Sequence, residues 1–263
     1  MPVPIVQVDA FTSSPFAGNP AAVCILDEAR PDWWLQDVAR EMNLSETAFL
    51  LPSADGYELR WFTPTTEVDL CGHATLASAH VLYEAGHLPH SQTARFDTRS
   101  GRLTAGKIGD WIEMDFPAQP AVPTVLPDGL ASALGQTPLW VGRSATDLLV
   151  ELDDEKTVRT LVPDLGALSK IDARGVIVTS RAVTVGVDFV SRFFAPRAGV
   201  PEDPVTGSAH CTLGPFWASR LDREDLVGYQ VSPRGGTVRV GVRGERIALA
   251  GQAVTVLRGE ILS

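Results

Sequence analysis

Residues 72–86 read GHATLASAHVLYEAG and predict a helix that is buried on most of its faces. Small and apolar residues fill nearly every position, and Gly86 stands where a glycine commonly ends a helix. A related pattern, TGSAHCTLGPFW, occupies residues 206–217. A helix without a polar face needs a surrounding sheet, so the sequence predicts two such helices, each enclosed by strands.

The segments before the two helices follow the same order. In the first half we expect strands at 4–11 and 21–26, a helix at 31–42, and strands beginning at Glu46 and Tyr57. From residue 139 the order strand, turn, strand, acidic pair, helix and strand recurs, and SRFFAP near 195 resembles LRWFTP near 62. A shared order over such a long period indicates duplicated domains rather than a solenoid.

The proline-rich segment FPAQPAVPTVLP, residues 116–127, is the expected linker, because proline favours extended backbone. We therefore predict an α+β fold of two pseudo-symmetric domains, 1–117 and 128–263, in which a curved sheet wraps one buried helix. The last strand could return to the first half. A cleft between two such domains is the default place for a ligand.

Composition narrows the class of partner. The formal net charge is −10 with no basic run, which argues against nucleic acid but allows a small anionic substrate. No apolar stretch approaches the ~18 residues that cross a bilayer, and the first residues lack the pattern of a signal peptide. Three scattered cysteines do not make a disulfide framework. These features predict a cytoplasmic protein with no membrane partner.

The two helix starts predict an anion site. The first turn of a helix leaves N–H groups unpaired and carries partial positive charge, and glycine lets a ligand approach closely. Gly72 in the first half, with Gly207 and Ser208 in the second, could thus hold a carboxylate without a metal. The alternative is that both glycines only begin buried helices.

Metal and cysteine chemistry are the competing interpretations of DLCGHAT, residues 69–75. The five histidines form neither an HExxH pattern nor a zinc spacing, so no metal is predicted. A thiol at a helix start has a lowered pKa, as a catalytic base needs. A two-thiol reaction would require a partner at the second helix start, but Thr206 stands there and Cys211 lies inside the helix. Cys71 is therefore expected to be a small packed residue.

Carboxylates remain as candidates for proton transfer. Glu46 enters an apolar strand, and burial would raise its pKa toward neutrality, where a group can both take and return a proton. The alternative is an edge-strand glutamate in water. Asp203 lies between two prolines and could instead form an Asx turn before the second helix. His73 could orient an acid or contact the substrate.

Long segments then resemble a known family. FTSSPFAGNPAAV, MNLSETAFL, RWFTPTTEVDLCGHATLASAHVL and EDPVTGSAHCTLGPFW are similar to the signature blocks of the PhzF-like isomerases, named for a phenazine-biosynthesis enzyme. The resemblance runs from about residue 4 to 218 in the family's order. It implies the fold of diaminopimelate epimerase, with a barrel-like, mostly antiparallel sheet around a central helix in each half, an active site between the halves, a homodimer and no cofactor.

The resemblance also implies roles for single residues. Glu46 matches the family's catalytic acid/base, His73 its proton-transfer or substrate-contacting histidine, and Asp203 and Ser208 its substrate-facing pair. The best-known member moves a proton between ring carbons of a dihydro-hydroxyanthranilate. Where that enzyme has alanine before Gly-His, this chain has Cys71. The motifs do not assign that enzyme's substrate to this chain.

The sequence therefore predicts a cofactor-independent isomerase that moves a proton on a small carboxylate-bearing substrate. Glu46, His73 and Asp203 are the expected catalytic residues, and Gly72, Gly207 and Ser208 the expected substrate contacts. Two alternatives stay open: an amino-acid racemase or epimerase that uses Cys71, and a non-catalytic metabolite-binding protein. The second alternative predicts an exposed Glu46 without polar partners.

Overall fold

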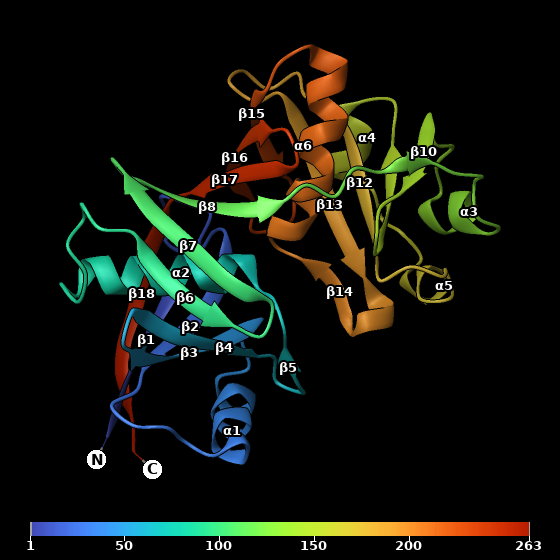
Figure 1. Ribbon diagram of the computed structural model, residues 1–263. Helices are drawn as coiled ribbons and strands as arrows, with labels where there is room; N and C mark the ends of the chain where they lie inside the picture. The colour runs from blue at the N-terminus through green and yellow to red at the C-terminus, as the bar shows by residue number, and fades with distance from the viewer. Residues whose placement is uncertain (1, 263) are drawn as a thin grey trace. The chain divides into compact units, whose positions relative to one another are not determined.

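The computed structural model describes residues 2–262, and the chain divides into two compact units (Figure 1). The first unit comprises the residues up to Asp115 together with those from Ala250 onward, and the second is Phe116–Leu249. Strands dominate both units and helices are few, which confirms the coarser part of the α+β prediction, a sheet-dominated fold that contains both strands and helices. Among the described residues, no helix is both long and apolar enough to cross a membrane.

The first unit is built from strands that precede and follow one long helix. Its elements are β1 (Val3–Ala10), β2 (Asn19–Ile25), α1 (Asp32–Met42), β3 (Glu46–Ser53), β4 (Gly56–Phe62), β5 (Glu67–Val68), α2 (Gly72–Glu84), β6 (Ala94–Thr98), β7 (Gly101–Ile108), β8 (Trp111–Pro117) and β18 (Ala253–Ile261). β1 pairs antiparallel with both β2 and β18. β2 and β3 run parallel, β3 and β4 antiparallel, and β4 and β6 parallel.

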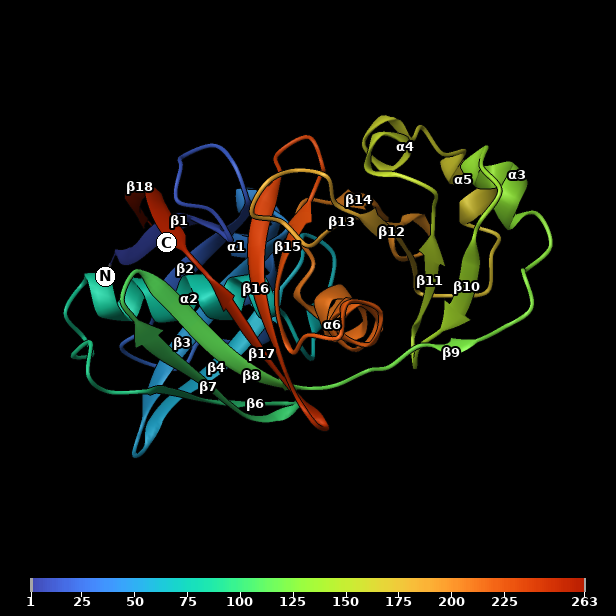
Figure 2. The same ribbon diagram turned by 90° about the horizontal axis from the view of Figure 1, so that it is seen from above.

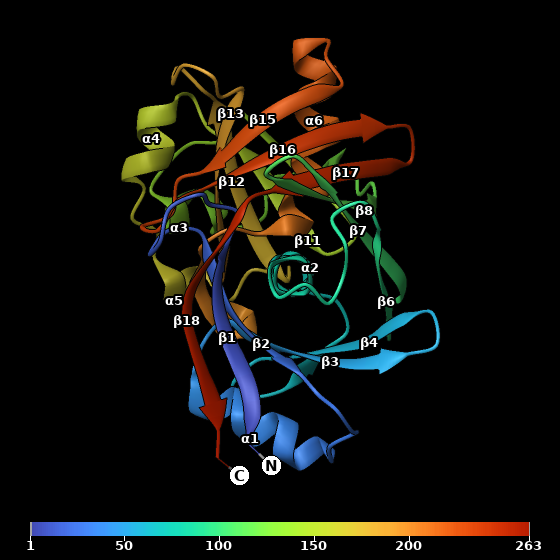
Figure 3. The same cartoon turned by 90° about the vertical axis from the view of Figure 1, so that its left-hand side faces the viewer.

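Helix α2 is the centre of the first unit. Figure 3 views it nearly end-on, with β1, β2, β3 and β7 around it, and all four strands contact it. Most of its residues are buried, as the sequence predicts for a helix without a polar face. The hydroxyls of its buried Thr75 and Ser78 bond within the helix, since Thr75 Oγ1 donates to the Cys71 carbonyl at 2.6 Å and Ser78 Oγ to the Ala74 carbonyl at 2.7 Å.

Helix α1 covers the outer face of the sheet. Its buried residues Trp34, Leu35, Val38 and Ala39 form one stripe, and the Trp34 ring meets Phe49 of β3 edge-on. Met42, at the end of the helix, is only half-buried. The helix begins one residue later than predicted, because proline 31 serves as its extended N-cap.

The second unit has fewer long helices and more short ones. Its elements are β9 (Val122–Pro123), α3 (Leu130–Leu134), β10 (Trp140–Arg143), β11 (Asp147–Glu151), α4 (Glu155–Thr160), α5 (Leu165–Leu168), β12 (Gly175–Arg181), β13 (Phe189–Ala195), the 3₁₀ turn η1 (Pro196–Ala198), β14 (Val200–Asp203), α6 (Gly207–Leu221), β15 (Asp225–Gln230), β16 (Gly236–Arg243) and β17 (Arg246–Gly251). The short helices α3 and α5 are absent from the prediction, since four or five residues carry no readable period.

The strand pairings of the second unit have the same order as those of the first. β11 and β12 run parallel, β12 and β13 antiparallel, β13 and β15 parallel, and β15 and β16 antiparallel. Figure 2 views α6 nearly along its axis beside β15 and β16, and both strands contact it. Twofold symmetry between the units stays a prediction. The common order of parallel and antiparallel strand pairs is the observation that supports it.

A proline inside α6 ties part of the linker to the second unit. Pro215 has no N–H, so the Cys211 carbonyl one turn earlier cannot receive its usual helical bond. The backbone N–H of Gln119 donates to that carbonyl instead, at 3.0 Å. Further along the linker, β9 pairs with β10. The segment expected to be only a connection is thus partly structured.

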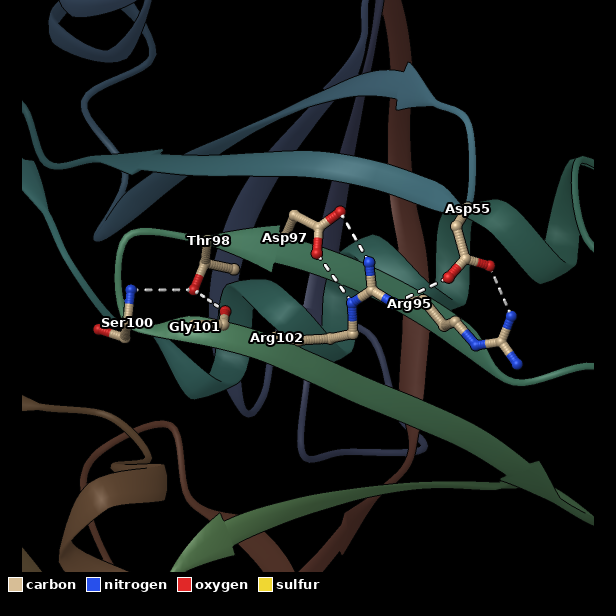
Figure 4. Close-up of polar contacts among 7 residues, drawn as sticks. All are labelled: Asp55, Arg95, Asp97, Thr98, Ser100, Gly101 and Arg102. Atoms are coloured by element: carbon tan, nitrogen blue, oxygen red, sulfur yellow. Dashed lines mark hydrogen bonds and ion pairs between the residues drawn. The ribbon is translucent and has the colours of Figure 1, made fainter.

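Charged side chains on the surface support the loop that leads into α2. Arg102 donates to both Asp97 and Asp55, and Arg95 also reaches Asp55, across the β3–β4 and β6–β7 hairpins (Figure 4). In the β6–β7 turn, Ser100 Oγ donates to the Asp69 carbonyl at 2.7 Å. Exposed ion pairs contribute little stability singly, so their main effect here is to fix where the loop lies.

A buried carboxylate organises the loop between β12 and β13. Glu155 is 4 % exposed and accepts hydrogen bonds from the backbone N–H groups of Val183 and Thr184, the Thr184 hydroxyl and Arg159 Nε. Burial alone would raise its pKa. The hydrogen bonds from Thr184, Val183 and Arg159 outweigh burial and lower the pKa of Glu155 from 4.5 to about 2.

We expect Glu155→Gln to remove about 2 kcal/mol of stability at pH 7. Because the folded pKa lies below the unfolded one, the carboxylate stabilises the protein above pH 4.5, and this contribution disappears as the pH falls toward 2. Urea unfolding of wild type and variant at several pH values measures the difference in their free energies of unfolding, which should become smaller as the pH is lowered. Glu224→Gln, at a carboxylate whose side chain is 77 % exposed, is the control.

Candidate active site

Glu46 lies where the parallel strands β2 and β3 begin. It is the first residue of β3, paired with Ala21 of β2, and β3 also pairs with β4. Its side chain is 18 % exposed. The alternative of an edge-strand glutamate in water is therefore wrong, because β3 has a neighbour on each side.

His73 stands in the first turn of α2 and faces Glu46. Its Nε2 lies 3.1 Å from Glu46 Oε2, and the His73 side chain is only 6 % exposed. The two atoms are close enough for an ion pair, but their alignment leaves each without a hydrogen bond among the described residues. Two buried polar atoms that keep bonding capacity at one point are suited to meet a ligand atom.

Cys71 contacts the other ring nitrogen of the same imidazole. It is the extended N-cap residue of α2, and its Sγ lies 3.5 Å from His73 Nδ1. Cys71 is buried, as expected, but it is more than a packing residue. The sequence analysis missed this contact, although the spacing of two residues across a helix start could have indicated it.

Burial and charge set the protonation of this cluster. Burial raises the pKa of the Cys71 thiol, and the nearby Glu46 charge raises it further. Burial alone would lower the pKa of His73, but interactions with Cys71 and Glu46 raise it well above 6.5. Cys71 and Glu46 together therefore favour the protonated ring against the cost of burying it.

The same three residues are the ones that could hold a metal ion. Glu46, Cys71 and His73 place one ligand atom each within 4.8 Å of one another. Cys71 contacts Nδ1 and Glu46 contacts Nε2. A carboxylate, a thiol and an imidazole are also donors that zinc accepts. The same cluster can therefore be considered for a proton or for an ion, and chelation distinguishes the two.

The start of α2 offers backbone donors next to this pair. No side chain caps the helix, and Gly72 and His73 form its first turn. Unsatisfied N–H groups at this point favour an anion. The structure therefore brings three of the predicted residues, Glu46, Gly72 and His73, to one place in the first unit.

The other predicted residues gather at the start of α6 in the second unit. Asp203 ends β14, and its Oδ2 accepts a hydrogen bond from the Thr206 hydroxyl. Gln230 donates to the Asp203 carbonyl at 2.7 Å and accepts from the Thr206 N–H at 2.9 Å. Thr206 is the N-cap residue of α6, and no hydrogen bond from its side chain caps the helix.

Ser208 sits in the first turn of α6, next to Gly207, and accepts a hydrogen bond from Arg174 Nη2 at 3.0 Å. Arg174 also donates to Asp147 through two nitrogens. Neither Arg174 nor Gln230 was a predicted site residue. Arg174 directly precedes β12 and Gln230 ends β15, and no local pattern connects them with residues 203–208.

Comparisons with known proteins agree on one family. Residues 8–259 match the phenazine biosynthesis-like proteins. An uncharacterized isomerase of Halalkalibacterium halodurans is 56 % identical over 100 % of this chain and 99 % of its own. The crystal structure of a PhzF-family phenazine biosynthesis protein from Enterococcus faecalis is 42 % identical, with a TM-score of 0.96 over 100 % of both chains. A predicted epimerase from Pseudomonas aeruginosa is 25 % identical, with a TM-score of 0.74 over 99 % of both chains.

We expect Glu46→Gln to lower the pKa of His73, because the variant removes one of the two groups whose interactions raise it against burial. In the wild type the pKa of the ring should lie above 6.5. Nitrogen NMR of the histidine rings between pH 5 and 9 measures both. His210, whose pKa burial lowers to about 4, is an internal control that should not respond. An unchanged His73 titration would show that Glu46 is not its partner.

Proposed function

This chain belongs to the family of phenazine biosynthesis-like proteins, and we propose that it is an isomerase in which Glu46 moves a proton on a small carboxylate-bearing molecule. The observation that carries the proposal is the Glu46 Oε2 to His73 Nε2 contact of 3.1 Å, at the start of an uncapped helix. The similarity to the uncharacterized isomerase of Halalkalibacterium halodurans supports the reaction class.

The proposed step needs only the groups of the cluster. A Glu46 carboxylate oxygen accepts a proton from a substrate carbon next to an unsaturated or carboxylate-bearing carbon, and the C–H electron pair moves into the substrate's π-system. Glu46 then returns the proton to another carbon, so the substrate is rearranged without oxidation. His73, held as an imidazolium, can donate through Nε2 to the charge that develops.

Binding is assigned to helix starts. We propose that the N–H groups of the first turn of α2, at Gly72, hold the substrate's carboxylate, because they are aligned donors with partial positive charge. The proposal also assigns Asp203, Gly207 and Ser208 to the substrate, on the strength of the family's motif and of the uncapped start of α6. It needs no cofactor or metal.

A racemase or epimerase that uses Cys71 is the second candidate. Its support is the Cys71 Sγ to His73 Nδ1 distance of 3.5 Å, which gives the thiol a proton acceptor. Its weakness is that burial and Glu46 raise the pKa of that thiol, whereas a catalytic thiolate needs a lowered one. A non-catalytic protein would leave Glu46 exposed and without polar partners, and Glu46 has neither property.

We expect Glu46→Gln to reduce solvent-deuterium incorporation into a turned-over substrate by ~10²–10⁴-fold, because the amide cannot accept the carbon-bound proton. Cys71→Ala should retain exchange within about tenfold, since it removes only a neighbour of His73. The readout is proton NMR in deuterium oxide over a set of unsaturated, aromatic and amino carboxylates. Loss of exchange in Cys71→Ala, with retention in Glu46→Gln, would favour the racemase.

The matched control is Glu41→Gln, which removes an exposed carboxylate from the end of α1 and should leave exchange unchanged. Adding a chelator to the wild type gives a separate check on the cluster as a metal site. The proposal expects full activity after chelation, and loss restored by added zinc would contradict it.

The proposal places this isomerase in the cytoplasm as a homodimer. Its support is the family resemblance and the composition of the chain. Light scattering of the purified protein measures the mass directly, and a monomer of 28.2 kDa would contradict the homodimer.

A further inference from the structure

Arg174 lies beside the first turn of α6, and its guanidinium is fixed from two sides. Its Nε and Nη2 donate to the two carboxylate oxygens of Asp147, at 2.9 and 2.5 Å. The ring of Phe193 lies below the guanidinium, 5.6 Å from it. Because paired parallel bonds match the planar guanidinium to a carboxylate, this geometry leaves the side chain little freedom.

The anchor belongs to the core of the second unit. Asp147 is fully buried at the start of β11, paired with Gly175 of β12. The Arg174 N–H also donates to the Thr146 carbonyl at 2.9 Å. A buried carboxylate is costly without a partner, so Asp147 needs the positive charge of Arg174. The same two bonds fix the position of the Arg174 guanidinium.

The same Nη2 that binds Asp147 also donates to Ser208 Oγ. A hydroxyl has one hydrogen and two lone pairs, and the bond from Arg174 occupies a lone pair. The Ser208 hydrogen must therefore point to a different acceptor, and none takes it among residues 2–262. A neighbouring cation also polarises the hydroxyl, which makes it a stronger donor.

The positive charge of Arg174 does not by itself attract a substrate anion. Its positive charge is already balanced by Asp147, and the charge of Asp203 acts on it as well. One cation with two carboxylates does not attract an anion at long range. What Arg174 contributes is the direction of the Ser208 hydroxyl.

We propose that Arg174 is a positioning residue, which acts through Ser208 to present a fixed hydroxyl donor to the carboxylate of the substrate. The inference rests on the proposed function, in which Ser208 contacts the substrate. It adds a preference: a carboxylate, which accepts strongly, is favoured over the amide or ester of the same acid.

Acetate is the probe, because it is small enough to enter any carboxylate site, and acetamide is its uncharged match. Amide NMR of the full chain follows Gly207 and Ser208 during titration with each. We expect acetate to shift both signals saturably and acetamide to bind at least about fivefold more weakly, since bonds to charged acceptors are the stronger class. Equal binding of the two probes would overturn the proposal.

The variants Arg174→Gln, Ser208→Ala and their combination separate orientation from charge. Arg174→Gln should weaken acetate binding about tenfold in the wild-type background and less than twofold in the Ser208→Ala background. Equal loss in both backgrounds would show that Arg174 acts by charge alone and would overturn the proposal. Arg174→Lys should resemble Arg174→Gln, because one ammonium cannot serve Asp147 and Ser208 with the same geometry.

Arg197→Gln is the matched control. It removes an arginine of the same unit that pairs with the exposed Asp172 and should leave acetate binding unchanged. If Arg174→Gln leaves Asp147 too costly to bury, Asp147→Asn with Arg174→Gln removes both charges and keeps the test valid. None of these measurements depends on Glu46, so lost deuterium exchange in Glu46→Gln and unchanged acetate binding in Arg174→Gln are independent outcomes.

Discussion

The burial of α2 is the constraint on which the first unit depends. A helix with small and apolar residues on nearly every side cannot lie on a surface, so strands must surround it, and only its first turn reaches functional side chains. The parallel pairing of β2 and β3 then places Glu46 opposite that turn. The carboxylate and the imidazole thus meet because the same packing that encloses the helix also fixes where β3 begins.

The two helix starts are alike in backbone and unlike in chemistry. Both lack a side-chain cap, so both keep unpaired N–H groups. At α2 the neighbours are a thiol, an imidazole and a carboxylate, which can hold a mobile proton. At α6 they are the Asp203 carboxylate, two hydroxyls, an amide and an arginine paired with Asp147, which are joined by direct hydrogen bonds. The two helix starts thus offer a ligand different donors and acceptors.

Sequence reasoning reached those features that depend on local pattern. The long strands and α1 follow from periodicity, and α2 and α6 from small and apolar residues on most faces. Their bounds differ by one or two residues from expectation, except that α6 continues to Leu221, four residues beyond the predicted pattern. Glu46 and His73 were chosen separately, and the structure pairs them. Arg174 and Gln230 were missed, because their partners lie 24 or more residues away along the chain and no spacing rule connects them. The contact between Cys71 and His73 was not predicted, because Cys71 was assessed only as one half of a pair of thiols.

The pairing of β18 with β1 has a consequence for synthesis on the ribosome. β1 is made first, yet one of its edges stays unpaired until residues 253–261 have emerged. Every strand of the second unit precedes those residues in the chain. The second unit can therefore reach its native pairings while the first still exposes a strand edge that invites mispairing with other chains. The unit that holds Glu46 and His73 is thus completed after the other.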